Sequence, residues 1–234
     1  MNAIILAAGK GERLQEITKT IPKPMIEFEG KPVLYHNIEL CKKYKIHNIF
    51  INLHHQSDKI INYFGDGVKY GVAIKYSIEN ELYGTSGAVK KIADEYWNDR
   101  ESGDSFLVIY GDNYSQFSID KLFQKLESSD AMGVIAFHYR KDTGHSGVAE
   151  FDKNGRILKF IEKPKPGESK SHWVNAGIYL FKTDIINYIS QGFSDFAKDI
   201  FPELLKKNIP LYGVCENAEV RSFDTMEMYN KNIR

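Results

Sequence analysis

Two glycines and three charged side chains follow the first apolar run of the chain. The run AIIL at residues 3–6 leads through two alanines into GKGER at residues 9–13. Successive backbone N–H groups of such a loop can point at an anion, and glycine lets the anion approach closely. The loop is therefore a candidate phosphate cradle, and a polar tight turn is the alternative. Two familiar phosphate motifs are absent, because G-x-G-x-x-G fails at Leu14 and no G-x-x-x-x-G-K-[ST] string exists.

Lys23 and Asp112 could supply charge to a bound phosphate. Lys23 stands between two prolines, which predict a stiff, extended mount for its ammonium group. Asp112 follows the apolar run at 106–110, at the expected carboxyl end of a strand, where open α/β sheets bind ligands. A carboxylate there suits Mg²⁺, which takes one or two carboxylates together with phosphate oxygens. The alternatives are an exposed loop lysine and an aspartate that caps a helix over 118–126, although Ser118 is the better cap.

Two later motifs offer groups that suit a phosphorylated sugar. Glu162 and Lys163 end a predicted strand and could hold hydroxyls and a phosphate, although a lone pair of this kind is common on surfaces. Asn175 and Gly177 interrupt an otherwise apolar strand. A glycine inside a strand often marks a bulge or a closely approaching ligand, and the asparagine amide can both donate and accept hydrogen bonds.

Asp224 is a further acidic candidate near the end of the chain. It follows an apolar position and precedes a predicted terminal helix. Asp224 or Thr225 is well suited to cap that helix, so helix capping competes with ligand binding as its role.

The elements that must position these residues alternate between strands and helices in the first half of the chain. Apolar runs predict strands over 3–7, 47–53, 72–77 and 106–110, and helical periodicity predicts helices over 33–44, 56–64 and 86–97. This alternation indicates right-handed βαβ units and a largely parallel sheet. Further strands are predicted over 131–139, 147–151, 157–161, 174–182 and 211–215, with an Asn-Gly hairpin turn at 152–156 and helices over 183–190 and 196–207.

Composition excludes several classes of protein. The 234 residues include 31 Lys plus Arg and 31 Asp plus Glu, and the resulting zero net charge argues against a broad nucleic-acid-binding surface. No run approaches the roughly 18 apolar residues of a membrane span. The first apolar run is short and precedes its basic residues, unlike a signal peptide. Cys41 and Cys215 lie outside any C-x-x-C spacing, so we expect a reduced, cytoplasmic protein.

Together these motifs resemble those of the sugar-1-phosphate nucleotidyltransferases. LAAGKGERL at 6–14 and IPKPM at 21–25 resemble the signature L-[AG]-G-G-x-G-[TE]-R-L…P-K-P of that family. The strings YGTSGAV (83–89), GDN (111–113), EKP (162–164) and VNAGIY (174–179) follow in the family's order and approximate spacing. FDTMEMY at 223–229 resembles the closing segment D-[IV]-G-T-P-x-x-Y but lacks its glycine and proline, so the resemblance supports Asp112 as a metal ligand more strongly than Asp224.

The resemblance spans residues 3–229 and implies a fold. That fold is a Rossmann-like three-layer α/β/α arrangement with a mixed, mainly parallel central sheet and a small additional β region for the sugar. We expect a single domain over 1–234, with an NTP-binding half at about 1–130 and a sugar-phosphate-binding half at about 131–234.

The resemblance also implies a role for each matching residue. Arg13, Lys23 and Asp112 would be catalytic, and Asp112 and Asp224 would hold the cofactor Mg²⁺. The residues implied for nucleotide binding are Leu6, Ala7, Ala8, Gly9, Gly11, Glu12, Arg13, Lys23, Gly84 and Thr85. Those implied for the sugar phosphate are Gly147, Glu162, Lys163, Asn175 and Gly177.

The implied reaction joins an NTP and a sugar 1-phosphate into an NDP-sugar and pyrophosphate, as in nucleotide-sugar and polysaccharide biosynthesis. The GTSGA string favours GTP with a mannose- or heptose-type 1-phosphate. Cytidylyl, uridylyl or thymidylyl transfer to another phosphorylated acceptor is the alternative, and a non-catalytic sensor on the same fold is a further one. An NAD-dependent oxidoreductase is disfavoured by the missing third glycine. No nucleic-acid or membrane partner is expected, and 14 Tyr and 14 Phe are enough for the interface of a homodimer.

Overall fold

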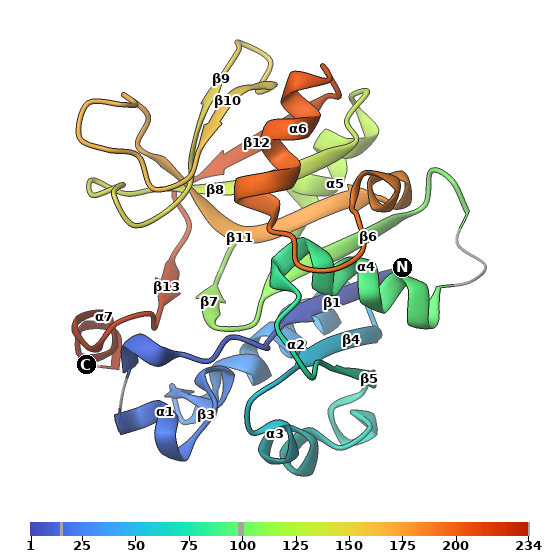
Figure 1. Cartoon of the computed structure of the whole chain (residues 1–234), viewed down its shortest axis with the longest axis vertical. Coiled ribbons are helices and arrows are strands. Elements are labelled where there is room, and N and C mark those ends of the chain that lie inside the picture. The colour runs from blue at the N-terminus through green and yellow to red at the C-terminus, as the bar shows by residue number, and fades with distance from the viewer. Residues whose placement is uncertain (15, 98–100, 234) are drawn as a thin grey trace. The chain divides into compact units, whose positions relative to one another are not determined.

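The computed structural model describes residues 1–14, 16–97 and 101–233, and their contacts divide the chain into two compact units. Unit 1 comprises Met1–Leu82, Val108–Ser115 and Val220–Arg234, and unit 2 comprises Tyr83–Leu107 and Gln116–Glu219. Both units are discontinuous in sequence, so one site can draw on distant segments (Figure 1).

Unit 1 is built on a sheet that follows the order β6 (Ser105–Tyr110), β1 (Asn2–Leu6), β4 (Asn48–Leu53) and β5 (Ala73–Ile78), and the second half of β6 belongs to this unit. β1, β4 and β5 pair in parallel. The helices are α1 (Glu16–Thr20), α2 (Val33–Lys43), α3 (Ser57–Phe64) and α7 (Met226–Ile233), with 3-10 turns η1 (Glu12–Leu14), η2 (Lys23–Met25) and η3 (Val68–Tyr70).

Two short antiparallel pairs add to unit 1. β2 (Glu27–Phe28) pairs with β3 (Lys31–Pro32), and β7 (Asn113–Ser115) pairs with β13 (Val220–Ser222). In the second pair Asn113 lies opposite Ser222. Because Asp112 comes just before β7 and Asp224 just after β13, this pairing brings the two aspartates close together.

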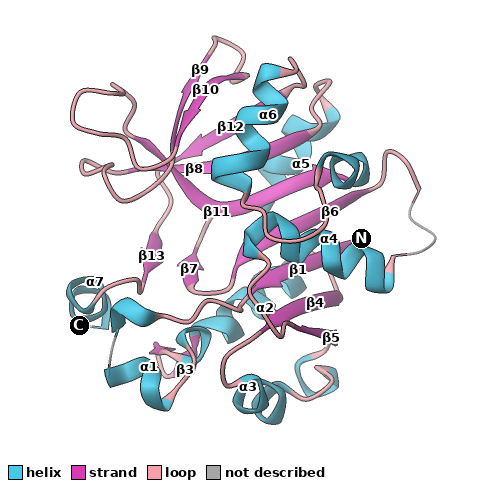
Figure 2. Cartoon of the chain, in the orientation of Figure 1, coloured by secondary structure: helices cyan, strands magenta, loops and turns pink. Residues whose placement is uncertain are grey.

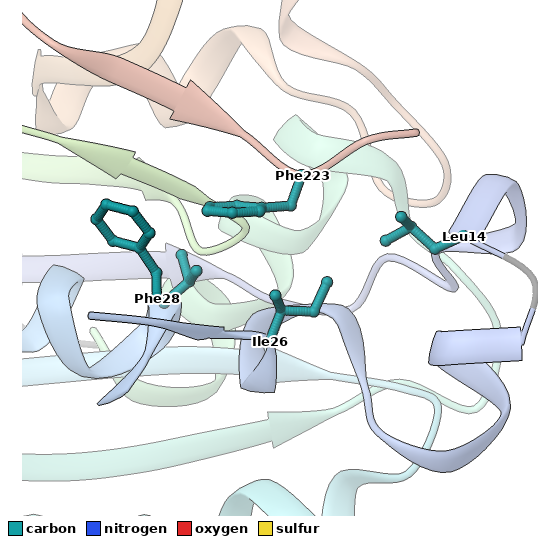
Figure 3. Packing of buried hydrophobic residues seen from close by; sticks show 5 residues of the cluster. Leu14, Ile26, Phe28 and Phe223 are labelled. Atoms are coloured by element: carbon teal, nitrogen blue, oxygen red, sulfur yellow. The ribbon is translucent and has the colours of Figure 1, made fainter. Parts of the chain in front are cut away.

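A hydrophobic cluster in unit 1 packs the N-terminal segment 14–33 against the chain that follows β13 (Figure 3). Its buried members are Leu14, Ile26, Phe28, Val33 and Phe223. The ring centroid of Phe28 lies 5.9 Å from that of Phe223 and 4.7 Å from that of Tyr114. The cluster therefore fixes the end of the glycine-rich loop, the chain after Lys23 and the residue before Asp224 in one packed core.

Unit 2 is built around β8 (Gly133–Tyr139), which pairs antiparallel with β11 (Trp173–Lys182) and parallel with β12 (Leu211–Glu216). β11 also pairs with β9 (Val148–Phe151), which forms a hairpin with β10 (Ile157–Ile161). Figure 2 shows these strands with the helices α4 (Gly84–Tyr96), α5 (Ile119–Glu127) and α6 (Phe201–Lys206). Unit 2 also contains the 3-10 helix η4 (Thr183–Tyr188) and the π-helical turn η5 (Phe196–Ile200).

The predicted α/β fold with a mixed, mainly parallel central sheet is confirmed, and the predicted strands and helices overlap observed ones. Two predicted helices differ in type. Residues 183–188 form a 3-10 helix, and the helix predicted over 196–207 begins as a π-helical turn. Pro202, which has no N–H, is the second residue after that turn, and the N–H of Phe201 donates to Phe196 O across a wider ring.

The Asn-Gly hairpin between β9 and β10 is confirmed. Gly155 has φ +81°, and Asp152 Oδ1 accepts the N–H groups of Asn154 (2.8 Å) and Arg156 (2.9 Å). Both cysteines are free; Cys41 is buried and Cys215 is exposed. None of the described helices combines the length and the apolar character needed to cross a bilayer.

His138 on β8 gives unit 2 a pH-dependent stability. Burial, with the nearby Arg140, lowers the pKa of His138 to about 4. An unfolded histidine has a pKa of about 6.5. Between about pH 6.5 and about pH 4 the side chain is therefore protonated in the unfolded chain and neutral in the folded chain. The free energy of unfolding therefore falls as pH drops from about 6.5 to about 4.

We expect His138→Gln to abolish most of this acid sensitivity. Between pH 7 and 4.5 the wild type should lose about 2.5 kcal/mol of unfolding free energy through this residue, as measured by urea unfolding. His145→Gln, at an exposed position, is the control and should behave like the wild type. An unchanged acid loss in His138→Gln would contradict the assignment.

Candidate functional site

The glycine-rich loop is tightly folded at Gly11 and open at Gly9. Gly11 has φ +66°, and a Cβ there would lie 2.6 Å from Cγ2 of Thr18, whose hydroxyl donates to Gly11 O at 3.0 Å. A Cβ on Gly9 would meet no atom within 4 Å. Gly11 therefore fixes the shape of the loop, while the exposed backbone at Gly9 is accessible to a ligand. Glu12 and Arg13 follow in η1, with exposed side chains.

Lys23 begins the 3-10 turn η2, so the predicted extended segment is wrong at this residue. Pro22 is extended, with φ −67° and ψ 147°, but the chain turns directly after it and Met25 N donates to Pro22 O at 2.8 Å. Pro24, at the second position of this turn, is tolerated because the first N–H groups of a helix have no internal partner. The turn buries Lys23 almost completely.

The ammonium group of Lys23 donates hydrogen bonds to Asp112 Oδ2 and Asp224 Oδ1. Nη2 of Arg13 lies 3.7 Å from the same Asp224 oxygen. Burial alone would lower the pKa of Lys23, but the two carboxylates outweigh it and raise the pKa above its usual value. Lys23 is therefore a charged ammonium group, and the structure unites four predicted site residues in one ion cluster, which we call the Lys23 centre: Arg13, Lys23, Asp112 and Asp224.

Neither aspartate is needed as a helix cap. α5 begins after Ser118, which occupies the cap position without a side-chain capping bond, and Asp112 pairs with Lys23 instead. At the terminal helix the hydroxyl of Thr225 accepts the N–H of Met228 at 3.2 Å. Thr225 thus serves the start of α7, and the carboxylate of Asp224 is directed to the Lys23 centre.

The donor set of the Lys23 centre fits a divalent cation such as Mg²⁺. Carboxylate oxygens of Asp112 and Asp224 converge on one nitrogen, so a cationic group already stands between them. Mg²⁺ is bound by one or two carboxylates plus phosphate oxygens and water. Among the described residues no group of three or more His, Cys, Asp or Glu could hold a metal. A metal held by these aspartates would therefore need further ligands from a bound phosphate and water.

A buried polar chain at the ends of β1, β4 and β5 was not predicted. Ala7 N donates to Asn52 Oδ1 at 2.9 Å, and Asn52 Nδ2 donates to Glu79 Oε1 at 2.8 Å. Asn52 and Glu79 are 3% and 2% exposed. The available signal was a polar residue close to the carboxyl end of each of two neighbouring predicted strands, 47–53 and 72–77. The backbones of Leu6 and Gly111 meet at the same edge, where Gly111 N donates to Leu6 O at 2.8 Å. Ala8, two residues after Leu6, is buried.

Among the predicted sugar-phosphate residues in unit 2, Gly147 packs against Glu162. A Cβ on Gly147 would lie 2.8 Å from Glu162 Oε2 and 2.5 Å from Cζ of Phe160. Burial raises the pKa of Glu162, an effect that Lys163 opposes and Asp195 reinforces. Lys163 Nζ lies 3.9 Å from Glu162 Oε1 and is half exposed. The acidic and basic groups therefore lie side by side, as the EKP motif predicted.

Asn175 and Gly177 form the predicted bulge in β11. The register with β8 shifts between Asn175 and Tyr179, and Gly177 has φ +71°. Asn175 Oδ1 accepts Gly177 N–H at 2.9 Å, and its Nδ2 donates to the Tyr179 hydroxyl at 2.7 Å. The amide is thus held in one orientation, with one hydrogen and one lone pair left for another partner.

Gly84 and Thr85, the remaining predicted nucleotide-binding residues, belong to unit 2. The Thr85 hydroxyl donates to Asp195 Oδ2 and accepts Phe196 N–H, both at 2.9 Å. The side chain of Thr85 is therefore already engaged within unit 2.

Comparison with known proteins identifies similar chains. Residues 2–220 match the protein family described as nucleotidyl transferase. The chain is 35% identical to UTP–glucose-1-phosphate uridylyltransferase of Synechocystis sp., over 100% of this chain and 63% of that one. It is 29% identical to mannose-1-phosphate guanylyltransferase 1 of Arabidopsis thaliana, over 87% of this chain and 56% of that one. The chain thus spans less than two thirds of the length of these curated relatives.

A similar fold is also found among solved structures. HddC from Yersinia pseudotuberculosis, complexed with GMP-PN, superposes with a TM-score of 0.80 and 26% sequence identity. The match covers 99% of this chain and 97% of HddC.

We expect Lys23→Met to lower the stability of the protein and to strengthen its response to Mg²⁺. Lys23→Met leaves two partly buried carboxylates without their ammonium partner. We expect a loss of about 2 kcal/mol in unfolding free energy in EDTA, less than for a fully buried pair because both aspartates are partly exposed. Millimolar Mg²⁺ should raise the Tm of this variant more than that of the wild type, because the cation no longer competes with an ammonium group.

Lys19→Met is the matched control, since Lys19 pairs with Glu16 in an exposed i,i+3 contact. It should change stability by less than about 0.5 kcal/mol and should show the wild-type response to Mg²⁺. An equal Mg²⁺ shift in wild type and Lys23→Met would contradict a shared cation position.

Proposed function

Because the chain belongs to the nucleotidyl transferase family, we propose that it transfers a nucleotidyl group from an NTP to a sugar 1-phosphate and releases pyrophosphate. The observation that carries this proposal is the Lys23 centre, which lies in the same unit as the open glycine-rich loop. Two polyanions must meet in this reaction, so charge neutralisation and alignment are the main tasks of the protein.

The chemistry needs no general base, because a sugar-phosphate oxygen is already ionised at pH 7. That oxygen forms a bond to the α-phosphorus of the NTP, and the bond from this phosphorus to the oxygen of the β-phosphate breaks. The electron pair leaves with pyrophosphate on the opposite side. Mg²⁺, bound by Asp112 and Asp224, would supply positive charge next to the phosphate oxygens.

The side chains of unit 1 divide this work. The backbone around Gly9 binds the phosphates, and the exposed guanidinium of Arg13 holds the pyrophosphate part that leaves. Lys23 contacts the phosphoryl group under attack, where a well-placed cation can contribute ~10³-fold or more to the rate. In unit 2, Lys163 binds the sugar phosphate, while Glu162 and Asn175 bind sugar hydroxyls.

For the substrates we propose GTP and a mannose- or heptose-type 1-phosphate. Two of the similar proteins support this choice, because the solved HddC structure is a complex with GMP-PN and one curated relative is a mannose-1-phosphate guanylyltransferase. Uridylyl transfer is the second candidate, favoured by the 35% identity to the Synechocystis uridylyltransferase.

A panel assay tests the proposal. Pyrophosphate release is measured with GTP, UTP, CTP and dTTP against mannose, heptose, glucose and N-acetylglucosamine 1-phosphates, with Mg²⁺ and with EDTA. We expect turnover with GTP and a mannose- or heptose-type 1-phosphate, and its loss in EDTA. Release with none of the pairs would overturn the proposed activity and favour a non-catalytic sensor.

A further inference from the structure

The YGTSG string of unit 2 is closely packed against residues 192–194. A Cβ on Gly84 would lie 2.3 Å from Ser194 O, and a Cβ on Gly87 would lie 2.3 Å from Gly192 O. Ser194 O accepts the N–H groups of Ser86 and Gly87, both at 3.1 Å. Both glycines of the string are therefore required by a backbone contact within unit 2.

Thr85 completes this contact with its side chain. Its hydroxyl donates to Asp195 Oδ2 and accepts Phe196 N–H, each at 2.9 Å. The other oxygen of Asp195 accepts the N–H groups of Ala197 (3.0 Å) and Lys198 (3.2 Å), which makes Asp195 the cap of η5. One threonine hydroxyl thus holds both the capping carboxylate and the first N–H of the turn.

The capped turn lies beside the end of β10. Phe160 of β10 packs against Phe201, which directly follows η5, with ring centroids 5.1 Å apart. Asp195 and Lys198 both act on the Glu162 carboxyl group, the first raising its pKa and the second lowering it. The positive charge of the exposed Lys198 therefore stabilises the ionised Glu162 carboxylate, as the charge of Lys163 does.

We propose that Thr85 is a positioning residue for the sugar 1-phosphate: through Asp195 it fixes turn η5, and Phe201 directly after that turn packs against β10, the strand that Glu162 follows. This inference rests on the proposed function, but it reverses the role that the resemblance of the GTSG string implies for Thr85. A hydroxyl engaged with Asp195 and Phe196 serves the acceptor substrate, and its loss should affect acceptor binding rather than NTP binding.

Thr85→Val tests this directly, because it keeps the branched shape and removes the hydroxyl. KM for the acceptor with the highest turnover in the panel should rise about tenfold, while KM for the NTP stays within twofold. Thr85→Ser, which retains the hydroxyl, should restore the acceptor KM to within about twofold of wild type. Thr183→Val is the matched control, since Thr183 is a buried threonine of unit 2 that donates to Glu101 O, and its two KM values should not change.

A rise confined to the NTP KM, an equal rise in both, or no change would overturn the proposal. If Thr85→Val does not fold, Asp195→Asn carries the same test, because it keeps a capping oxygen and replaces the acceptor of the Thr85 bond. Failure of the proposed function is recognised separately, as a wild type that releases no pyrophosphate. In that case calorimetric titration measures the affinity of wild type and Thr85→Val for mannose 1-phosphate and glucose 1-phosphate. Tighter binding to wild type than to Thr85→Val supports the proposal. Equal affinities, or no binding to either protein, overturn it.

Discussion

One buried ammonium group between two carboxylates is the constraint on which the site in unit 1 depends. Lys23 is 89 residues from Asp112 and 201 residues from Asp224 in sequence, yet it contacts both. A buried charge is costly unless it is paired, so the fold must bring the three segments together. The β7–β13 pair aligns the chain around the two aspartates, and the core of Leu14, Ile26, Phe28, Val33 and Phe223 fixes the segments that flank Lys23 and the glycine-rich loop.

The glycines divide by what surrounds them. Gly11, Gly84, Gly87 and Gly147 are needed because another part of the chain occupies the space of a Cβ, whereas Gly9 faces open space. A glycine motif in a sequence therefore mixes packing requirements with ligand-accessible backbone. In this chain the glycines of the GTSG string pack against residues 192–194, whereas the first glycine of the GKG loop leaves its backbone exposed.

Much of this arrangement could be predicted from the sequence. The strands and helices follow from hydrophobic periodicity, and Lys23 and Asp112 follow from their places beside prolines and at a strand end. The 3-10 turn at Lys23, the β7–β13 pair and the Asn52–Glu79 hydrogen bond could not be predicted in the same way. Each depends on partners from distant segments, and short irregular elements have no periodicity to detect. The engagement of Thr85 by Asp195, 110 residues away, has the same cause.

The proposed function requires that Lys23 and a divalent cation share one pair of carboxylates, and that Lys23 contacts a phosphate oxygen when the nucleotide is bound. A crystal structure with Mn²⁺ and a non-hydrolysable GTP analogue measures this directly through the anomalous signal of the metal. We expect a peak coordinated by Asp112 and Asp224, with the Lys23 ammonium group on a phosphate oxygen. A peak elsewhere, or Lys23 still bridging both aspartates beside a bound nucleotide, would contradict it.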